Sequence, residues 1–148
     1  MQPHDLIINK ASGPENRRQA YAVRREVFIR EQGIDPGEEY DGKDDEAVHF
    51  LALLDGRAVG TLRLLIEGNE GRVGRMAVLK EYRKRGIGRA LIAECVAEAR
   101  RRRLDRLYLH AQKSAIDFYR KCGFRSYGAP FAEAGIPHQA MEMLLKSS

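Results

Sequence analysis

Hydrophobic positions recur along this chain with two different spacings, and each spacing predicts one kind of element. Segments in which apolar residues return every three to four positions, such as Ala20, Val23 and Val27, predict helices with one buried stripe. Short apolar or alternating segments bounded by turn residues predict strands. We therefore expect helices over residues 14–30, 86–102 and 114–121. We expect strands over residues 6–8, 48–54, 59–66, 72–78, 106–110, 124–127 and 141–145.

The connections between these strands predict a mixed sheet. Turn signals at residues 55–56 and 68–71 join three strands as an antiparallel meander. The helix over 86–102 then acts as a crossover, which implies that the strand after it runs parallel to the strand before it. No repeat or linker is visible. The order of elements predicts a single α/β domain over residues 1–148, an α+β arrangement with a mixed central sheet and helices on both faces.

Residues 31–46 interrupt these patterns with eight acidic residues, three glycines and one proline. This composition does not suit a core element, so we expect a long loop with at most one helical turn. Its carboxylates suit either a cationic substrate, such as an amine, or simple solubility. Arg24 and Arg25 lie just before it on the predicted helix and are either surface charges or residues that reach into a cleft.

Composition narrows the class of protein. The chain has 148 residues, of which 43% are apolar, so it can bury one sizeable core. No apolar run reaches the roughly 18 to 20 residues of a membrane span, and the first ten residues lack the pattern of a signal peptide. Cys95 and Cys122 both fall in apolar helical patterns, so we expect buried thiols in a reducing, cytoplasmic setting.

The net charge of +5 comes largely from two basic blocks, over residues 83–89 and 100–106. Such blocks can bind nucleic acid. No zinc-finger spacing or aromatic RNA-binding motif accompanies them here, so nucleic acid is not the expected partner. A solvated face together with an anionic ligand explains the charge more simply.

One stretch predicts a strand, then a basic turn that contains Gly86 and Gly88, and then the start of a long helix: residues 73–90, VGRMAVLKEYRKRGIGRA. A helix start carries unpaired backbone N–H groups and the positive end of the helix dipole. Glycines let a ligand approach the backbone, and four basic side chains add charge: Arg83, Lys84, Arg85 and Arg89. The turn lacks the third glycine of a dinucleotide fingerprint and the Lys-Ser/Thr pair of a P-loop. It predicts a site for a phosphate or pyrophosphate.

Arg83-x-x-Gly86-x-Gly88 after an apolar strand, with Phe118-Tyr119-x-x-x-Gly123-Phe124 further on, resembles the GNAT superfamily of acyl-CoA N-acyltransferases. The resemblance implies the GNAT fold, in which a mostly antiparallel sheet splays at one parallel strand pair. It implies an N-acetyltransferase that moves the acetyl group of acetyl-CoA to a primary amine of a small molecule or peptide, without a metal. Neither motif contains a cysteine, which fits direct attack by the amine in a ternary complex.

The resemblance also assigns the residues that would hold acetyl-CoA. The turn would bind the pyrophosphate of coenzyme A, and the strand before it would line the pantetheine arm. A backbone N–H near Ala77 or Val78 would donate to the developing oxyanion. The implied cofactor-binding residues are Met76, Ala77, Val78, Arg83, Lys84, Arg85, Gly86, Gly88 and Arg89.

Tyr119 matches the family position that approaches the sulfur of coenzyme A. A free tyrosine has a pKa near 10, so its hydroxyl is protonated at neutral pH and could return a proton to the departing thiolate. The alternative interpretation is a core aromatic, because Tyr119 lies three residues after Ile116 on an apolar face.

A general base is needed because an alkyl amine is mostly protonated near pH 7. The sequence leaves six candidates: His49, His110, His138, Glu39, Asp41 and Glu142. Histidine suits proton transfer near neutral pH, so His110 and His138 join Tyr119 as the candidate catalytic residues. Glu39 and Asp41 stay in consideration because many family members use a carboxylate that acts through water.

Two further stretches, residues 24–32 and 134–138, look like the ElaA-like or YjcF-like bacterial branch of GNAT proteins. If the branch shares a pocket, the acceptor site would be lined, beside His110 and His138, by Arg24, Phe28, Gln32, His49 and Arg63.

Three other possibilities follow from the sequence. Arg24-x-x-x-Phe28 followed by Glu39-Tyr40-Asp41 also resembles acyl-homoserine-lactone synthases, although those enzymes are longer and generally lack the basic turn. A non-catalytic module could bind coenzyme A or nucleic acid through the turn. An exposed edge strand could pair two copies as a homodimer.

Overall fold

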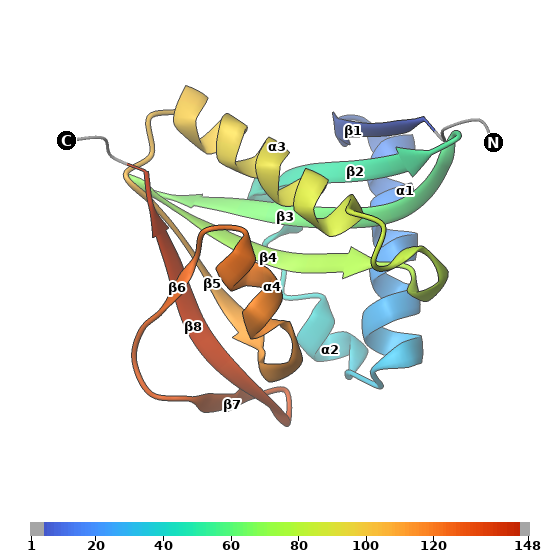
Figure 1. Cartoon of the computed structure of the whole chain (residues 1–148). Helices are drawn as coiled ribbons and strands as arrows, with labels where there is room; N and C mark the ends of the chain where they lie inside the picture. The colour runs from blue at the N-terminus through green and yellow to red at the C-terminus, as the bar shows by residue number, and fades with distance from the viewer. Residues whose placement is uncertain (1–4, 146–148) are drawn as a thin grey trace.

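The computed structural model describes residues 5–145, and one sheet runs through that part of the chain (Figure 1). Its strands are β1 (Leu6–Lys10), β2 (Val48–Leu54), β3 (Arg57–Glu67), β4 (Glu70–Val78), β5 (Arg106–Gln112), β6 (Arg125–Ser126), β7 (Phe131–Glu133) and β8 (Ile136–Leu144). The spatial order is β1-β2-β3-β4-β5-β8-β6, with β7 also beside β8. Within the described residues, β4 and β5 are parallel and every other pair is antiparallel. The mixed sheet and the meander are confirmed.

Helices cover both faces of the sheet, as expected (Figure 1). They are α1 (Pro14–Arg24), which continues as the π-helix η1 (Arg25–Glu31), α2 (Pro36–Glu39), η2 (Asp44–Glu46), η3 (Lys80–Tyr82), α3 (Ile87–Arg101), η4 (Lys113–Ala115) and α4 (Ile116–Lys121). On β2, Phe50 and Ala52 pack in the cluster with α3, whereas Leu51 packs with Ala20 of α1. This alternation follows from the two-residue period of a strand. Between residues 5 and 145, no helix is both long and apolar enough to cross a membrane.

The acidic segment after η1 is more ordered and more buried than its composition suggested. It forms α2 and η2, and Glu39 is only 2% exposed. The expectation that this stretch would stay out of the core is therefore wrong at Glu39. The interpretation of Arg24 as a surface charge is also wrong, because its side chain is 1% exposed. Each charge can be buried because the other lies beside it, with Arg24 Nε 2.6 Å from Glu39 Oε1.

The C-terminal part of the sheet starts earlier than expected. The strand expected from Met141 begins at Ile136 and pairs with β7 through a hairpin turn at Ala134-Gly135, whose φ angles are 52° and 73°. Glycine and proline had suggested a loop here. Pro137 fits the strand because β5 pairs with β8 only as far as His138, so its missing N–H removes no bond to β5.

Candidate functional site

The parallel strands β4 and β5 separate halfway along their length. They pair from Glu70 with Arg106 to Val73 with Leu109, and each strand then continues beside its other neighbour. A bulge opposite Thr61–Arg63 bends β4 at this point, where Arg75 has a φ of 51°. The splay that the family resemblance implied is confirmed, and backbone of β4 beyond Val73 faces a gap in place of β5.

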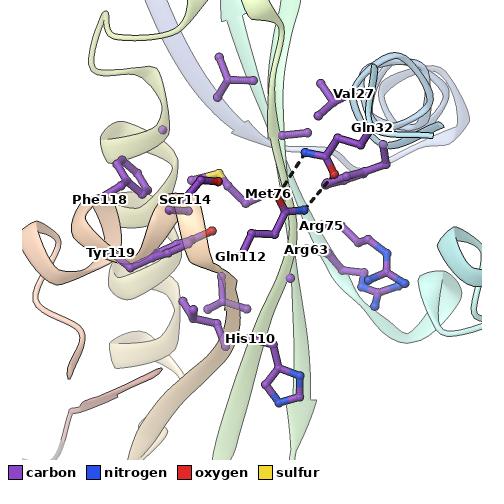
Figure 2. Close-up of a pocket in the computed structure, with 18 of the residues that line it drawn as sticks. Val27, Gln32, Arg63, Arg75, Met76, His110, Gln112, Ser114, Phe118 and Tyr119 are labelled. Atoms are coloured by element: carbon purple, nitrogen blue, oxygen red, sulfur yellow. Dashed lines mark hydrogen bonds between the residues drawn. The ribbon is translucent and has the colours of Figure 1, made fainter. Parts of the chain in front are cut away.

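A cavity of about 1040 Å³ opens at this splay (Figure 2). It is lined by η1, β4, β5, the start of α3, α4 and the β7–β8 hairpin. The expected site residues that line it are Phe28, Gln32, Arg63, Met76, Ala77, Val78, Arg83, Lys84, Gly86, Gly88, Arg89, His110, Tyr119 and His138. Arg24, His49 and Arg85 lie outside its lining; Arg85 instead stacks on the Tyr82 ring, with its guanidinium carbon 5.3 Å from the ring centroid.

The turn before α3 presents a row of free backbone donors. Within the described chain, none of the N–H groups from residue 84 to residue 89 has a hydrogen-bond partner, and the first helical bond joins Ala90 N–H to Gly86 O. Gly86 caps the helix with a φ of 82°, and a Cβ added there would meet nothing within 4 Å. A Cβ on Gly88 would lie 3.0 Å from Phe118 Cζ, so this glycine allows α4 to pack closely. The turn thus has free N–H donors at a helix start, a feature that an anion-binding site needs.

Arg83 closes one side of this turn. Its guanidinium makes two bonds to the Glu31 carboxylate, of 2.7 and 2.8 Å, and its Nε donates to Val78 O at 2.9 Å. The hydrogen bonds from Arg83 lower the pKa of Glu31 below its usual range. Arg83 therefore ties the end of η1 to the end of β4 beside the row of free N–H groups.

Tyr119 packs as a core aromatic and also lines the cavity. Its ring packs edge-on against Phe118 and Phe124, with centroids 5.0 and 6.0 Å away. Its hydroxyl points toward the cavity (Figure 2) and has no hydrogen-bond partner among residues 5–145. Burial raises the pKa of Tyr119 well above its usual value, so the hydroxyl stays protonated across the neutral range.

Two histidines that line the same cavity meet around Glu133. His110 Nδ1 lies 3.1 Å from Glu133 Oε1, and His138 Nε2 lies 3.7 Å from Glu133 Oε2. His138 Nδ1 donates to Ile136 O at 2.7 Å, which leaves Nε2 as the atom that can accept a proton. The Phe131 ring packs against both imidazoles: its centroid lies 5.0 Å from that of His110 and 6.0 Å from that of His138. Arg72 joins the cluster, because its Nη2 is 3.1 Å from His110 Nδ1.

The other base candidates have different surroundings. Glu142 binds Arg106 and Arg125 and does not line the cavity. His49 is turned to the acidic segment, where its Nε2 lies 2.9 Å from Asp44 O, and burial lowers its pKa. Asp41 lines the cavity, but hydrogen bonds from Arg63 hold the pKa of this carboxyl well below its usual range, so it is a poor base.

Three arginines pair with three carboxylates of the acidic segment: Glu39, Asp41 and Asp44. Arg63 binds both oxygens of Asp41 at 2.9 Å, and Arg75 Nε lies 2.9 Å from Glu39 Oε2. Arg24 completes the network with Glu39 and Asp44. Figure 2 shows Arg63 and Arg75 side by side below the splay. Charge pairs at Glu39, Asp41 and Asp44 therefore hold the segment against the sheet.

A pair of glutamines crosses the splay. Gln112 Nε2 donates to Gln32 Oε1 at 2.9 Å, and Gln32 Nε2 lies 3.4 Å from Gln112 Oε1 (Figure 2). Gln32 follows η1 and Gln112 ends β5, so the two amides bridge elements on either side of β4. In Figure 2 this bridge lies next to Met76, between Tyr119 and the two arginines.

Several cavity residues were missed from the sequence. Arg72, Arg75 and Gln112 lie on the two splayed strands, so their position next to the expected splay was a usable signal. Glu133 lay in a stretch interpreted as a loop, and no local pattern marks it. Its role in the cluster depends on the β7–β8 hairpin, which places it beside both histidines.

Comparisons with known proteins agree with this geometry. Residues 17–145 match the acetyltransferase (GNAT) domain family. The uncharacterised N-acetyltransferase YjcF of Bacillus subtilis is 33% identical over 132 residues, which cover 88% of this chain and 94% of that protein. An acyl-CoA N-acyltransferase structure from Pseudomonas aeruginosa has a TM-score of 0.80 at 28% identity, over 95% of this chain and 99% of that one. Escherichia coli ElaA shares the fold, with a TM-score of 0.81 at 23% identity over 95% and 99% of the two chains. The chain belongs to the GNAT family of acetyltransferases.

Proposed function

We propose that this protein transfers the acetyl group of acetyl-CoA to a primary amine by direct attack within a ternary complex. The observation that carries the proposal is the shared cavity. The free N–H groups before α3, the Tyr119 hydroxyl and the His110–Glu133–His138 cluster all line it. A donor site, an acid and a base are thus in reach of one bound pair of substrates.

The turn fits the diphosphate of coenzyme A. It combines a row of unpartnered N–H groups, the N-terminus of a 15-residue helix and an open space above Gly86. Lys84 and Arg89 line the same space and add positive charge. Met76 and Val78 would line the arm that follows. Acetyl-CoA supplies the activated thioester, and the remaining chemistry belongs to the chain.

Val78 is the better candidate for the oxyanion donor. Leu79 N–H bonds to Val59 O on β3, and neighbouring residues of a strand point their backbone groups to opposite edges. The backbone groups of Val78 therefore face the gap left by β5. Its carbonyl is already held by Arg83, which fixes the direction of the peptide. Its N–H would donate to the thioester oxygen as that oxygen gains charge.

Tyr119 and His138 would handle the two protons. The Tyr119 hydroxyl has no competing partner among the described residues and would donate its proton to the sulfur as the thiol departs. His138 Nε2 would accept a proton from the incoming ammonium, with Glu133 stabilising the resulting imidazolium. His110 would support this cluster through its own contact with Glu133.

Direct transfer suits the cavity better than an acyl-enzyme route. Cys95 and Cys122 do not line the cavity, and burial raises the pKa of both thiols. A thiol needs its thiolate form to act as a nucleophile. The amine itself is therefore the nucleophile in this proposal.

The test is thiol release from acetyl-CoA over a panel of amino acids, polyamines, aminoglycosides, arylamines and short peptides, with acetyl-CoA binding measured beside it. Amine-dependent release supports the proposal. Acetyl-CoA binding without release by any panel member, at full amine saturation, would contradict the enzyme and favour a binding module. Salt-dependent binding of DNA or RNA that ignores acetyl-CoA would contradict the donor site itself.

A matched pair of glycine variants tests the turn. Gly86 and Gly13 both cap helices at positive φ, 82° and 90°, and both have open space where a Cβ would be. Valine should strain each site by a similar amount, about 1–2 kcal/mol. We expect Gly86→Val to weaken acetyl-CoA binding by about tenfold or more, and Gly13→Val to leave it nearly unchanged. Equal effects would place the donor elsewhere.

A further inference from the structure

The acceptor side of the cavity carries a guanidinium, that of Arg72, whose ion pair with Glu133 is long, at 3.8 Å. Arg72 Nη2 lies 3.1 Å from His110 Nδ1 and 3.8 Å from Oε1 of the Glu133 carboxylate. The other two nitrogens of this guanidinium, Nε and Nη1, make no hydrogen bond within residues 5–145. Its side chain is 26% exposed and lines the cavity, so these donors are available to a bound molecule.

The two neighbouring arginines, Arg63 and Arg75, are less suited to bind a carboxylate of the substrate, because each already pairs with a carboxylate of the protein. Arg63 is bound to Asp41 and Arg75 to Glu39, so the arginines offset the negative charge that these carboxylates present to the cavity.

The floor between these two arginines is open. Gly74 lies between Arg72 and Arg75 on β4 and lines the cavity, and a Cβ added to it would meet nothing within 4 Å. Arg72 and the Glu133 carboxylate, which is 43% exposed and close to both histidines, line the same cavity and lie 3.8 Å apart. The space therefore offers one cationic and one anionic group to the same small molecule.

We propose that the acceptor is a small amine that also carries a carboxylate, such as an α-amino acid, with Arg72 binding its carboxylate and the Glu133–His138 pair receiving its ammonium. The inference rests on the proposed function. It favours such zwitterions because an arginine fork binds a carboxylate through two charge-assisted hydrogen bonds. A simple alkylamine would supply no carboxylate for the Arg72 donors, and a polyamine would find Glu39 and Asp41 already paired with Arg75 and Arg63.

The test compares each of several amino acids with its carboxamide and with the amine that lacks the carboxyl group. We expect kcat/KM to favour the carboxylate by about tenfold or more. Arg72→Gln should reduce this ratio to near one, whatever it does to the rate common to both substrates through its contact with His110. The exposed Arg25→Gln should leave the ratio unchanged. Loss of turnover through a disturbed His110 would lower both substrates equally and so leave the ratio intact, which would overturn the assignment of Arg72.

A binding measurement keeps the inference separate from the proposed function. With the protein saturated with coenzyme A, amino acids should raise the unfolding temperature more than their carboxamides do, and Arg72→Gln should remove the difference. Preference for carboxamides, polyamines or internal lysines of peptides, with acetyl-CoA bound and turned over, would overturn the inference but keep the function. Failure to bind acetyl-CoA would overturn both.

Discussion

Replacing Arg24 by methionine should destabilise the protein strongly although it touches no substrate in the proposed site. The guanidinium is 1% exposed and binds Glu39 at 2.6 Å and Asp44 at 2.8 Å. Although burial alone would lower it, bonds to Asp44 and Glu39 raise the pKa of Arg24, so the group is charged in the folded state. Methionine fills much of the same volume but leaves a buried carboxylate with one cation fewer.

The expected cost follows from the partners that remain. Breaking a buried ion pair by removing one member costs about 3–5 kcal/mol. Glu39 keeps Arg75 at 2.9 Å and Asp44 keeps Arg63 at 3.1 Å, which places the loss at the lower end of that range. A loss of about 3 kcal/mol corresponds to a fall of roughly 6–12 °C in the unfolding temperature of a chain of this size.

Chemical denaturation at pH 7 measures this loss, with Arg25→Met as the matched control. Arg25 is the next residue along the helix and is exposed, so its substitution should stay within about 0.5 kcal/mol. Acetyl-CoA affinity should be retained in both folded variants, because Arg24 lies outside the cavity lining, while acceptor turnover should fall in Arg24→Met. Equal stabilities of the two variants would refute the idea that this network holds the acidic segment in place.

Three further outcomes are expected. Tyr119→Phe should reduce kcat by about 10²–10⁴-fold. Acetyl-CoA binding and stability should stay nearly unchanged, because the hydroxyl has no internal partner in the described chain. A raised Kd for acetyl-CoA with normal kcat would contradict the role of Tyr119 as an acid. Gln112→Leu should change stability by less than about 1 kcal/mol, because the hydrogen bond from Gln112 to Gln32 is exposed. The same substitution should change turnover, because it removes the bridge over the splay. Unchanged turnover would show that the bridge is only a surface contact. The hydrogen bond from Arg102, aided by Arg101, lowers the pKa of Glu98 from 4.5 to about 2, so the unfolded chain binds the proton more tightly and stability should be lost as the pH falls from about 4.5 toward 2. Glu98→Gln should flatten this part of a urea-denaturation pH series, and an unchanged slope would show that Glu98 is not responsible.

Local pattern was enough to predict most elements and the donor turn. The meander, the crossover helix and the strand order around β4 and β5 follow from hydrophobic period and turn residues, which act over a few positions. Gly86 and Gly88 were informative for the same reason: a helix that begins at a glycine-bearing basic turn exposes its N–H groups whatever the rest of the chain does. These features are determined by neighbours in the sequence.

The acceptor half of the site was decided by contacts between distant residues. Arg63 and Asp41 are 22 positions apart, and His110 and Glu133 are 23 apart, so no local period indicates that they meet. From sequence alone a charged residue is predicted to be exposed, because burying a charge is favourable only when an opposite charge lies beside it. That partner is brought into place only by the tertiary fold. The sequence by itself thus determined the fold class, the family resemblance and the anion-binding turn. The tertiary structure alone decided which charges are paired and that Glu133 contacts two histidines. It also decided that two nitrogens of the Arg72 guanidinium stay free to donate hydrogen bonds within the described residues.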